Sequence, residues 1–145
     1  MVEVMSRIET RSDSAIALTG DTLRVLYVFP GAAEGSAMIF AGKQVEAMRK
    51  LGVDPEIFAL ESRTDPAHLR RESARFRQCI ASCRPELIHA QYGTVTACLA
   101  ALLTTIPLVI TFRGSDLNPA PSDPWARSFA RRWFSQYAAR KAARI

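Results

Sequence analysis

The stretch Leu23–Phe29, which reads LRVLYVF, decides the fold class. A continuous apolar run rich in β-formers is typical of a strand that is buried on both faces, as strands of parallel sheets are. Pro30 and Gly31 end this strand, and Ser36 is placed to cap a helix that runs to about Leu51. The stretch therefore predicts a parallel sheet that opens with a strand, a glycine-containing loop and a helix.

The alternation of strand and helix continues along the rest of the chain. Further strands are expected at Glu56–Leu60, Glu86–Ala90 and Leu108–Phe112, and further helices between Thr64 and Pro85, at 93–103 and at 124–143. This pattern predicts a doubly wound, Rossmann-like α/β sheet with right-handed crossovers and strand order 2-1-3-4. We expect a single domain at residues 23–145 after a flexible leader at 1–22. Because the chain stops where a fifth strand would begin, we expect it to be truncated.

The composition excludes several classes of protein. The chain contains no run of eighteen apolar residues, and its start lacks the basic and apolar regions of a secretory signal. The three cysteines, Cys79, Cys83 and Cys98, have no histidine near them at the spacing of a zinc site, so we expect small buried thiols in a reducing compartment. The sequence predicts a cytoplasmic protein without a metal ion or another cofactor.

The net charge of +5 comes from the end of the chain. Residues 125–145 include six basic residues and no acid, whereas the remainder has 13 basic and 14 acidic residues. Trp125, Phe129, Trp133 and Tyr137 recur there at every fourth position. We expect a helix that packs this aromatic stripe on the sheet and leaves its arginines in solvent. The alternative is peripheral contact with an anionic membrane at its inner face. Nucleic acid is not an expected partner, because the charge follows no groove and no binding motif is present.

Three loops are expected to meet at one edge of the sheet. Open α/β sheets bind ligands at the carboxyl ends of their strands, where the strand order reverses, which here is between the first and third strands. The loop at 31–36 contains two glycines and opens a helix whose free N–H groups suit a diphosphate. The loops at 91–94 and 113–118 follow the third and fourth strands. The sequence therefore predicts a crevice formed by these three loops.

Three side chains near this crevice are candidates for chemistry. His89 ends a strand and either polarises or deprotonates a hydroxyl, or is satisfied by a backbone carbonyl. Arg113 suits a phosphate or a sugar hydroxyl and cannot act as a general base. Asp116 either orients Arg113 or accepts a hydrogen bond from a sugar hydroxyl, or it forms an Asx-turn or helix cap. A hydrolase triad of Ser115 with His89 and Asp116 is not expected, because the G-x-S-x-G elbow is missing.

Three segments together resemble the N-terminal domain of family 4 glycosyltransferases. LRVLYVFPGAAEGSAMIFAGKQVEAMRKLGV, at 23–53, resembles the opening strand, glycine loop and helix of the family. ELIHAQYGTVTA, at 86–97, resembles the strand that ends in D-[VI]-[IV]-H-A-H, and PLVITFRGSDLNP, at 107–119, resembles the segment P-hydrophobic-hydrophobic-T-[FV]-H-G-x-D. The resemblance implies a retaining, metal-independent hexosyltransferase with two Rossmann-like halves of the GT-B fold. It would transfer a sugar from a nucleotide-sugar donor to a sugar or lipid-linked acceptor.

The resemblance also implies roles for individual residues. Matched position by position, the catalytic residues are His89, Arg113 and Asp116, and the residues that line the substrates are Gly31, Glu34, Gly35, Ser36, Tyr92, Gly93 and Gly114. Arg113 stands where the family most often has histidine, and Gln91 stands where a second histidine is common. The nucleotide-binding half lies outside this chain, so the chain alone is expected to be inactive. The alternative function is a non-catalytic, flavodoxin-like binding module.

Overall fold

The chain folds as a four-stranded parallel sheet with helices on both faces. The computed structural model describes residues 22–31, 39–61, 65–113 and 124–142. The strands lie in the order β2-β1-β3-β4, as the sequence predicts, and every neighbouring pair is parallel. Each end of a strand lies within two residues of its predicted position. The strands are β1 (Arg24–Pro30), β2 (Asp54–Leu60), β3 (Leu87–Ala90) and β4 (Leu108–Ile110), and the helices are α1 (Ile39–Lys50), α2 (Pro66–Cys83), α3 (Thr94–Leu103) and α4 (Trp125–Lys141).

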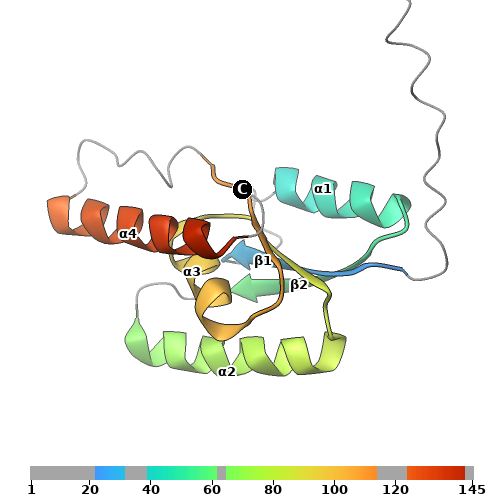
Figure 1. The fold of residues 1–145 in the computed structure, drawn as a ribbon, viewed down its shortest axis with the longest axis horizontal. Helices are drawn as coiled ribbons and strands as arrows, with labels where there is room; N and C mark the ends of the chain where they lie inside the picture. The colour runs from blue at the N-terminus through green and yellow to red at the C-terminus, as the bar shows by residue number, and fades with distance from the viewer. Residues whose placement is uncertain (1–21, 32–38, 62–64, 114–123, 143–145) are drawn as a thin grey trace, which may run out of the picture.

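The side chains of β1 alternate between two hydrophobic clusters, one on each face of the sheet. Leu26 and Val28 belong to the cluster that α2 and α3 cover, whereas Val25, Tyr27 and Phe29 belong to the cluster under α1. This alternation follows from the two-residue period of a strand. Figure 1 shows α1 on one side of the sheet and α2 on the other. A central strand buried on both faces is what the apolar run LRVLYVF predicts.

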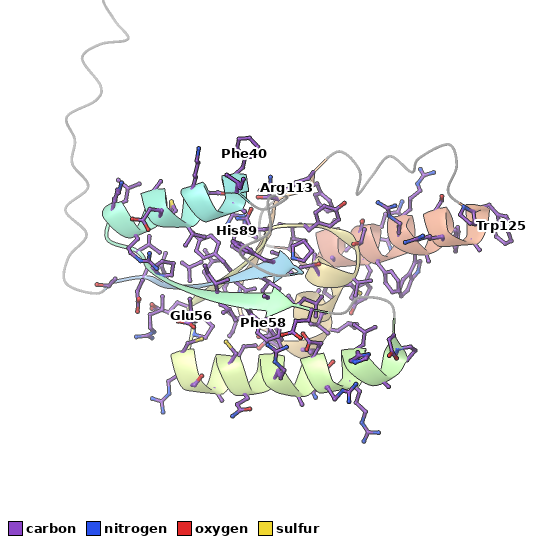
Figure 2. The ribbon with its side chains drawn as sticks, turned by 180° about the vertical axis from the view of Figure 1, so that it is seen from behind. Phe40, Glu56, Phe58, His89, Arg113 and Trp125 are labelled. Carbon is purple, nitrogen blue, oxygen red and sulfur yellow. The ribbon has the colours of Figure 1, made fainter. Side chains whose placement is uncertain are left out.

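Helix α2 is tied to the carboxyl end of β2 by a buried carboxylate. Glu72 accepts a hydrogen bond from the backbone N–H of Glu61 at 3.2 Å and one from Arg75 at 2.5 Å. The Arg75 guanidinium also lies over the Phe58 ring, 5.4 Å from its centroid. Because both Glu72 oxygens have donors, its charge is compensated inside the fold. In Figure 2, Phe58 points from the sheet toward α2.

Helix α4 contradicts the expected packing of its aromatic stripe. Trp125, Phe129 and Trp133 are 83%, 67% and 52% exposed. The helix instead packs on α3 through its small residues Ser135 and Ala138, which are fully buried. Small side chains let two helix backbones approach closely. If the three large rings lay between α4 and α3 instead, they would hold the two backbones apart. Figure 2 shows Trp125 at the outer end of α4, away from the sheet.

Among the described helices, none combines the length and the apolar character needed to cross a lipid bilayer. The leader expected at 1–22 lies outside the described residues except for Thr22, so its flexibility stays a prediction.

Candidate functional site

Three chain segments reach the carboxyl edge of the sheet where the strand order reverses. Gly31 follows β1 with a positive φ of 81° and donates its N–H to the carbonyl of Leu60 at 2.8 Å. The backbone N–H of Gln91 donates to Val28, and that of Thr111 donates to Ala90, each at 2.9 Å. These bonds extend the parallel ladder past the ends of β3 and β4. Figure 2 shows His89 and Arg113 near the arrowheads of the strands.

Half of the predicted site residues lie in the described part of the chain. Gly31, His89, Tyr92, Gly93 and Arg113 are described. The other predicted site residues, Glu34, Gly35, Ser36, Gly114 and Asp116, lie outside the described residues.

His89 is buried below the carboxyl edge of the sheet, and two neighbouring side chains contact its ring. It is 9% exposed, its Nε2 shares a hydrogen bond of 2.8 Å with the Thr111 hydroxyl, and its ring lies 5.3 Å from the ring of Tyr27. Burial, and then the nearby Arg113 guanidinium, lower the pKa of His89 below its ordinary value. The imidazole is therefore neutral at physiological pH, with one nitrogen as donor and the other as acceptor.

Gln91 connects three elements at this edge. It is fully buried, and both its backbone and side-chain oxygens accept hydrogen bonds from Arg113, at 3.2 and 3.0 Å. Its side-chain nitrogen donates to Gln44 of α1 at 3.1 Å. The same nitrogen also lies 3.4 Å from both ring nitrogens of His89, within hydrogen-bond distance of each. His89 and Arg113, predicted from separate segments, therefore meet through Gln91.

The turn from β3 into α3 is packed tightly against α4. Thr94 has a φ of 51°, which is uncommon for a β-branched residue, and its backbone N–H donates to the Ser135 hydroxyl at 3.0 Å. A Cβ on Gly93 would lie 2.6 Å from the ring of Phe112 and 3.1 Å from the Ser135 oxygen. Only glycine fits at this position. Strained backbone is often found at functional sites, where the surrounding packing maintains it.

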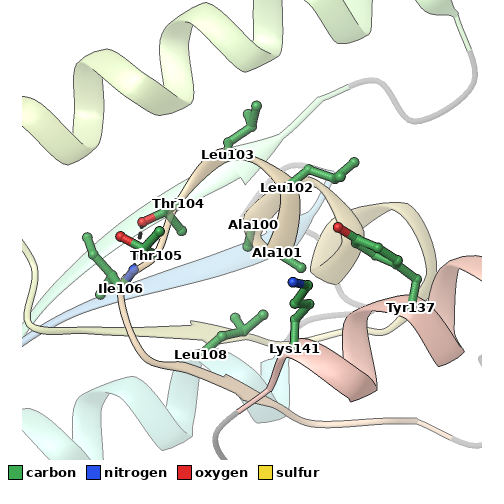
Figure 3. Close-up of a pocket in the computed structure, with 10 residues that line it drawn as sticks. All are labelled: Ala100, Ala101, Leu102, Leu103, Thr104, Thr105, Ile106, Leu108, Tyr137 and Lys141. Atoms are coloured by element: carbon green, nitrogen blue, oxygen red, sulfur yellow. Dashed lines mark hydrogen bonds between the residues drawn. The ribbon is translucent and has the colours of Figure 1, made fainter.

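A cavity of about 660 Å³ lies away from this edge. Thr104, Ile106 and Leu108 line it at the amino end of β4, and Tyr137 and Lys141 of α4 point across it toward α3, as Figure 3 shows. Open α/β sheets bind ligands at the opposite, carboxyl end of their strands. We therefore place the candidate site at the carboxyl edge despite the size of this cavity.

Comparison with known families identifies the chain. Residues 62–145, more than half of the chain, match the family described as glycosyl transferase 4-like domain. The chain belongs to this family. The match includes both β3 and β4 with the loops after them, and it confirms the family that the sequence motifs resemble.

Solved structures confirm the fold of this glycosyl transferase 4-like domain. The UDP-GlcNAc 2-epimerase of Methanocaldococcus jannaschii matches 83% of the chain with a TM-score of 0.60 and 12% identity. A putative UDP-N-acetylglucosamine 2-epimerase of Listeria monocytogenes matches 86% of it with a TM-score of 0.54 and 15% identity. Both have the GT-B type of fold, and the chain spans 38% of the length of each. No curated protein matches the chain.

Sequence reasoning missed four residues that shape the site of this glycosyl transferase 4-like domain. Gln91 opens the predicted crevice loop at 91–94, but the sequence assigns it no role there beyond a departure from the family. The other three, Gln44, Thr111 and Ser135, are distant in sequence from their partners, and only Thr111 has a local signal, since it lies in the family-like segment at 107–119. Their roles follow from hydrogen bonds that span 47, 22 and 41 positions of the chain.

The described residues contain no group of three His, Cys, Asp or Glu side chains that could hold a metal ion. Cys98 is buried, and Cys79 and Cys83 are partly buried on α2. Burial raises the pKa of both Cys79 and Cys98 to about 11. The thiols are therefore protonated at neutral pH, as expected of packing residues rather than nucleophiles.

Proposed function

We propose that this chain is the acceptor-side half of a retaining, metal-independent glycosyltransferase that uses a nucleotide-sugar donor. The observation that carries the proposal is the meeting of His89 and Arg113 through Gln91 at the carboxyl edge of the sheet. Membership of the glycosyl transferase 4-like family supports it. The motif resemblance supplies the retaining mechanism, the absence of a metal requirement and the class of donor.

Arg113 is the residue that we assign to direct contact with substrate. Its guanidinium is always charged, partly buried and fixed by Gln91, so it can bind a phosphate or sugar oxygen with little loss of side-chain freedom. His89 lies below the edge as a neutral imidazole and is hydrogen-bonded to the Thr111 hydroxyl. Through this bond it can orient the Thr111 hydroxyl toward a hydroxyl of the substrate. We retain Asp116 as the third catalytic residue, and Gly31, Glu34, Gly35, Ser36, Tyr92, Gly93 and Gly114 as residues that line the substrates.

We further propose that the chain alone does not transfer sugar. The chain spans 38% of the length of the similar solved structures. In a GT-B enzyme the site lies between two halves, and one half alone neither orients both substrates nor excludes water from them. The nucleotide-binding half is therefore a required partner of this domain.

The test is a transfer assay with nucleotide sugars, applied to this chain and to the complete product of the reading frame that encodes it. We expect no transfer by the chain and transfer by the complete product. Arg113→Ala should lower the kcat/KM of the complete product by about 10²-fold, because it removes a charge at the reacting groups. Arg24→Ala is the matched control, since Arg24 lies exposed at the start of β1. An active Arg113→Ala protein would mean that the site lies elsewhere.

A second proposal concerns the exposed aromatic face of α4, formed by Trp125, Phe129 and Trp133. We propose that this face lies on an anionic membrane surface at the inner side of the cytoplasmic membrane. Aromatic rings suit the interfacial region, and the six basic residues of 125–145, without any acid, complement anionic headgroups. A lipid-linked acceptor would then reach the domain from the membrane.

Flotation with vesicles tests this contact. The chain should float with vesicles that contain phosphatidylglycerol and stay behind with vesicles of phosphatidylcholine alone. The double variant Phe129→Ser and Trp133→Ser should lose flotation, whereas Leu102→Ser, which changes an exposed apolar residue of α3, should keep it. Equal flotation of the two variants would contradict the proposal.

A further inference from the structure

The cavity of about 660 Å³ at the amino end of β4 is lined by a charge, by hydroxyl groups and by apolar side chains. Lys141 and Tyr137 of α4 point across it toward the end of α3 (Figure 3). Thr104 and Thr105 add hydroxyl groups just after α3 ends. The rest of the lining is apolar and consists of Ala100, Ala101, Leu102, Leu103, Ile106 and Leu108. A ligand that matches this lining needs both polar groups and carbon–hydrogen surface.

The ammonium group of Lys141 is the charge of this cavity. No aspartate or glutamate occurs in the described stretches 87–113 and 124–142, and no described carboxylate forms an ion pair with Lys141. Arg140 adds a second positive charge to the last turn of α4. The potential in the cavity is therefore positive and attracts an anion. A single ammonium suits the one charge of a carboxylate, whereas phosphate is bound best by the planar fork of an arginine.

The end of α3 supplies hydrogen-bond acceptors on the opposite wall. The last carbonyls of a helix have no partner within it. Among the described residues, no hydrogen bond reaches the carbonyls of Ala101, Leu102 or Leu103. The Thr104 hydroxyl accepts the N–H of Ile106 at 3.0 Å and keeps its own proton to donate. Carbonyls repel a carboxylate but accept from hydroxyl groups, so the ligand must carry hydroxyls at this wall.

Tyr137 forms a fixed wall of the cavity. Its ring stacks on Trp133 with the centroids 5.8 Å apart and an angle of 18° between the planes. The residue is partly buried, and its hydroxyl forms no hydrogen bond with a described residue, so this group can bond to a ligand. Leu102, which is 61% exposed, offers apolar surface from α3. Covering this surface with carbon–hydrogen groups of a ligand removes it from water.

We propose that this cavity binds a hydroxylated carboxylic acid of about the size of one sugar ring, such as a uronic acid. Lys141 pairs with the carboxylate, the ligand hydroxyls donate to the carbonyls at the end of α3, and the Tyr137 hydroxyl bonds to a ring oxygen. Pockets for small molecules have volumes of about 300–1,000 Å³, and this cavity lies within that range. The site lies at the opposite end of the sheet from the carboxyl edge, so the proposal does not rest on the proposed function.

Titration calorimetry of the chain with glucuronate tests this site. Glucose, which has the ring hydroxyls without the charge, and acetate, which has the charge without the hydroxyls, are the control ligands. We expect glucuronate to bind at least about tenfold more tightly than either, because only glucuronate engages Lys141 and α3 together. Lys141→Gln should weaken glucuronate binding about tenfold or more. Arg140→Gln is the matched control, since it removes the same charge from the adjacent position, outside the cavity lining.

Tyr137→Phe provides a second, independent variant, because it keeps the ring and removes only the hydroxyl. It should weaken binding about twofold to tenfold, as loss of a neutral hydrogen bond does. Circular dichroism checks that each variant is folded. Absence of glucuronate binding, equal affinities of the native chain and Lys141→Gln, an equal loss in Arg140→Gln, or binding of glucose or acetate as tight as that of glucuronate would overturn the assignment. Lysine-dependent binding by the chain, together with a complete product that transfers no sugar, would refute the proposed function and support this site.

Discussion

Arg113 donates two hydrogen bonds to Gln91, from Nε to the backbone carbonyl at 3.2 Å and from Nη2 to the side-chain Oε1 at 3.0 Å. The amide nitrogen of the same side chain donates to Gln44 of α1 at 3.1 Å. These two partners determine which end of the amide faces the guanidinium. One buried side chain therefore joins α1, the end of β3 and the end of β4, and it holds the cation that we assign to substrate contact.

Gln91→Leu should lower the free energy of unfolding by about 1–3 kcal/mol, because it removes the hydrogen bonds that the buried amide makes with Arg113 and Gln44. Urea denaturation measures this change. In a double-mutant cycle with Arg113→Ala, we expect a coupling of at least about 0.5 kcal/mol, since the two side chains are in contact. Arg49→Ala, at an exposed ion pair with Glu46, should instead be additive with Gln91→Leu. Additive effects of Gln91→Leu and Arg113→Ala would show that their contact carries no energy.

His89 should make the stability of the chain depend on pH. Its pKa is lower in the folded chain than in the unfolded chain, so the unfolded state binds a proton first as the pH falls. Its contribution is complete above the ordinary pKa of about 6.5 and is lost as the pH falls from there toward the folded pKa. Urea denaturation at pH 7.5 and 5.5 should show lower stability at pH 5.5.

The control for this pH effect is His89→Gln, which keeps His68 and all other titratable groups. The variant should show a smaller difference in stability between pH 7.5 and 5.5 than the native chain. An unchanged difference would assign the effect to another group.

Gly93→Ala should destabilise the fold by about 1–3 kcal/mol, because the added Cβ would overlap the ring of Phe112 at 2.6 Å. The matched control is Gly42→Ala on α1, where a Cβ meets no atom within 4 Å. That substitution should stabilise the helix by about 0.5–1 kcal/mol, since alanine loses less backbone entropy than glycine. Midpoints of urea denaturation compare the two, and similar midpoints would refute the tight packing of the β3–α3 turn.

The cysteines should react slowly with iodoacetamide at pH 8 in the folded chain. With a pKa of about 11, only about one thiol in a thousand of Cys79 and Cys98 is ionised at that pH, and the thiolate is the reactive form. Unfolding in urea should restore rapid labelling at both positions, which peptide mapping by mass spectrometry detects. Rapid labelling of Cys98 in the folded chain would contradict its burial in α3.

The order of elements was determined by local patterns in the sequence. The apolar run at Leu23–Phe29 predicts a central parallel strand, and strict alternation of strands and helices predicts the order β2-β1-β3-β4. The prediction of the central strand and that of the strand order both depend on apolar runs and periodicity, which can be seen in short stretches of sequence. The segments around His89 and Arg113 also carry the family resemblance, because they lie next to strand ends and keep their spacing.

Only the tertiary structure decided which side chains meet and which face of α4 is covered. The pairs Gln44–Gln91 and Thr94–Ser135 join positions that are 47 and 41 residues apart, and no local pattern encodes them. The aromatic period of α4 predicts a buried stripe, yet the helix buries Ser135 and Ala138 and leaves Trp125 exposed. A hydrophobic period indicates a helix face that would be stabilised by burial. Close packing against α3 depends on shape as well, and Ser135 and Ala138 fit there whereas the large aromatic rings do not.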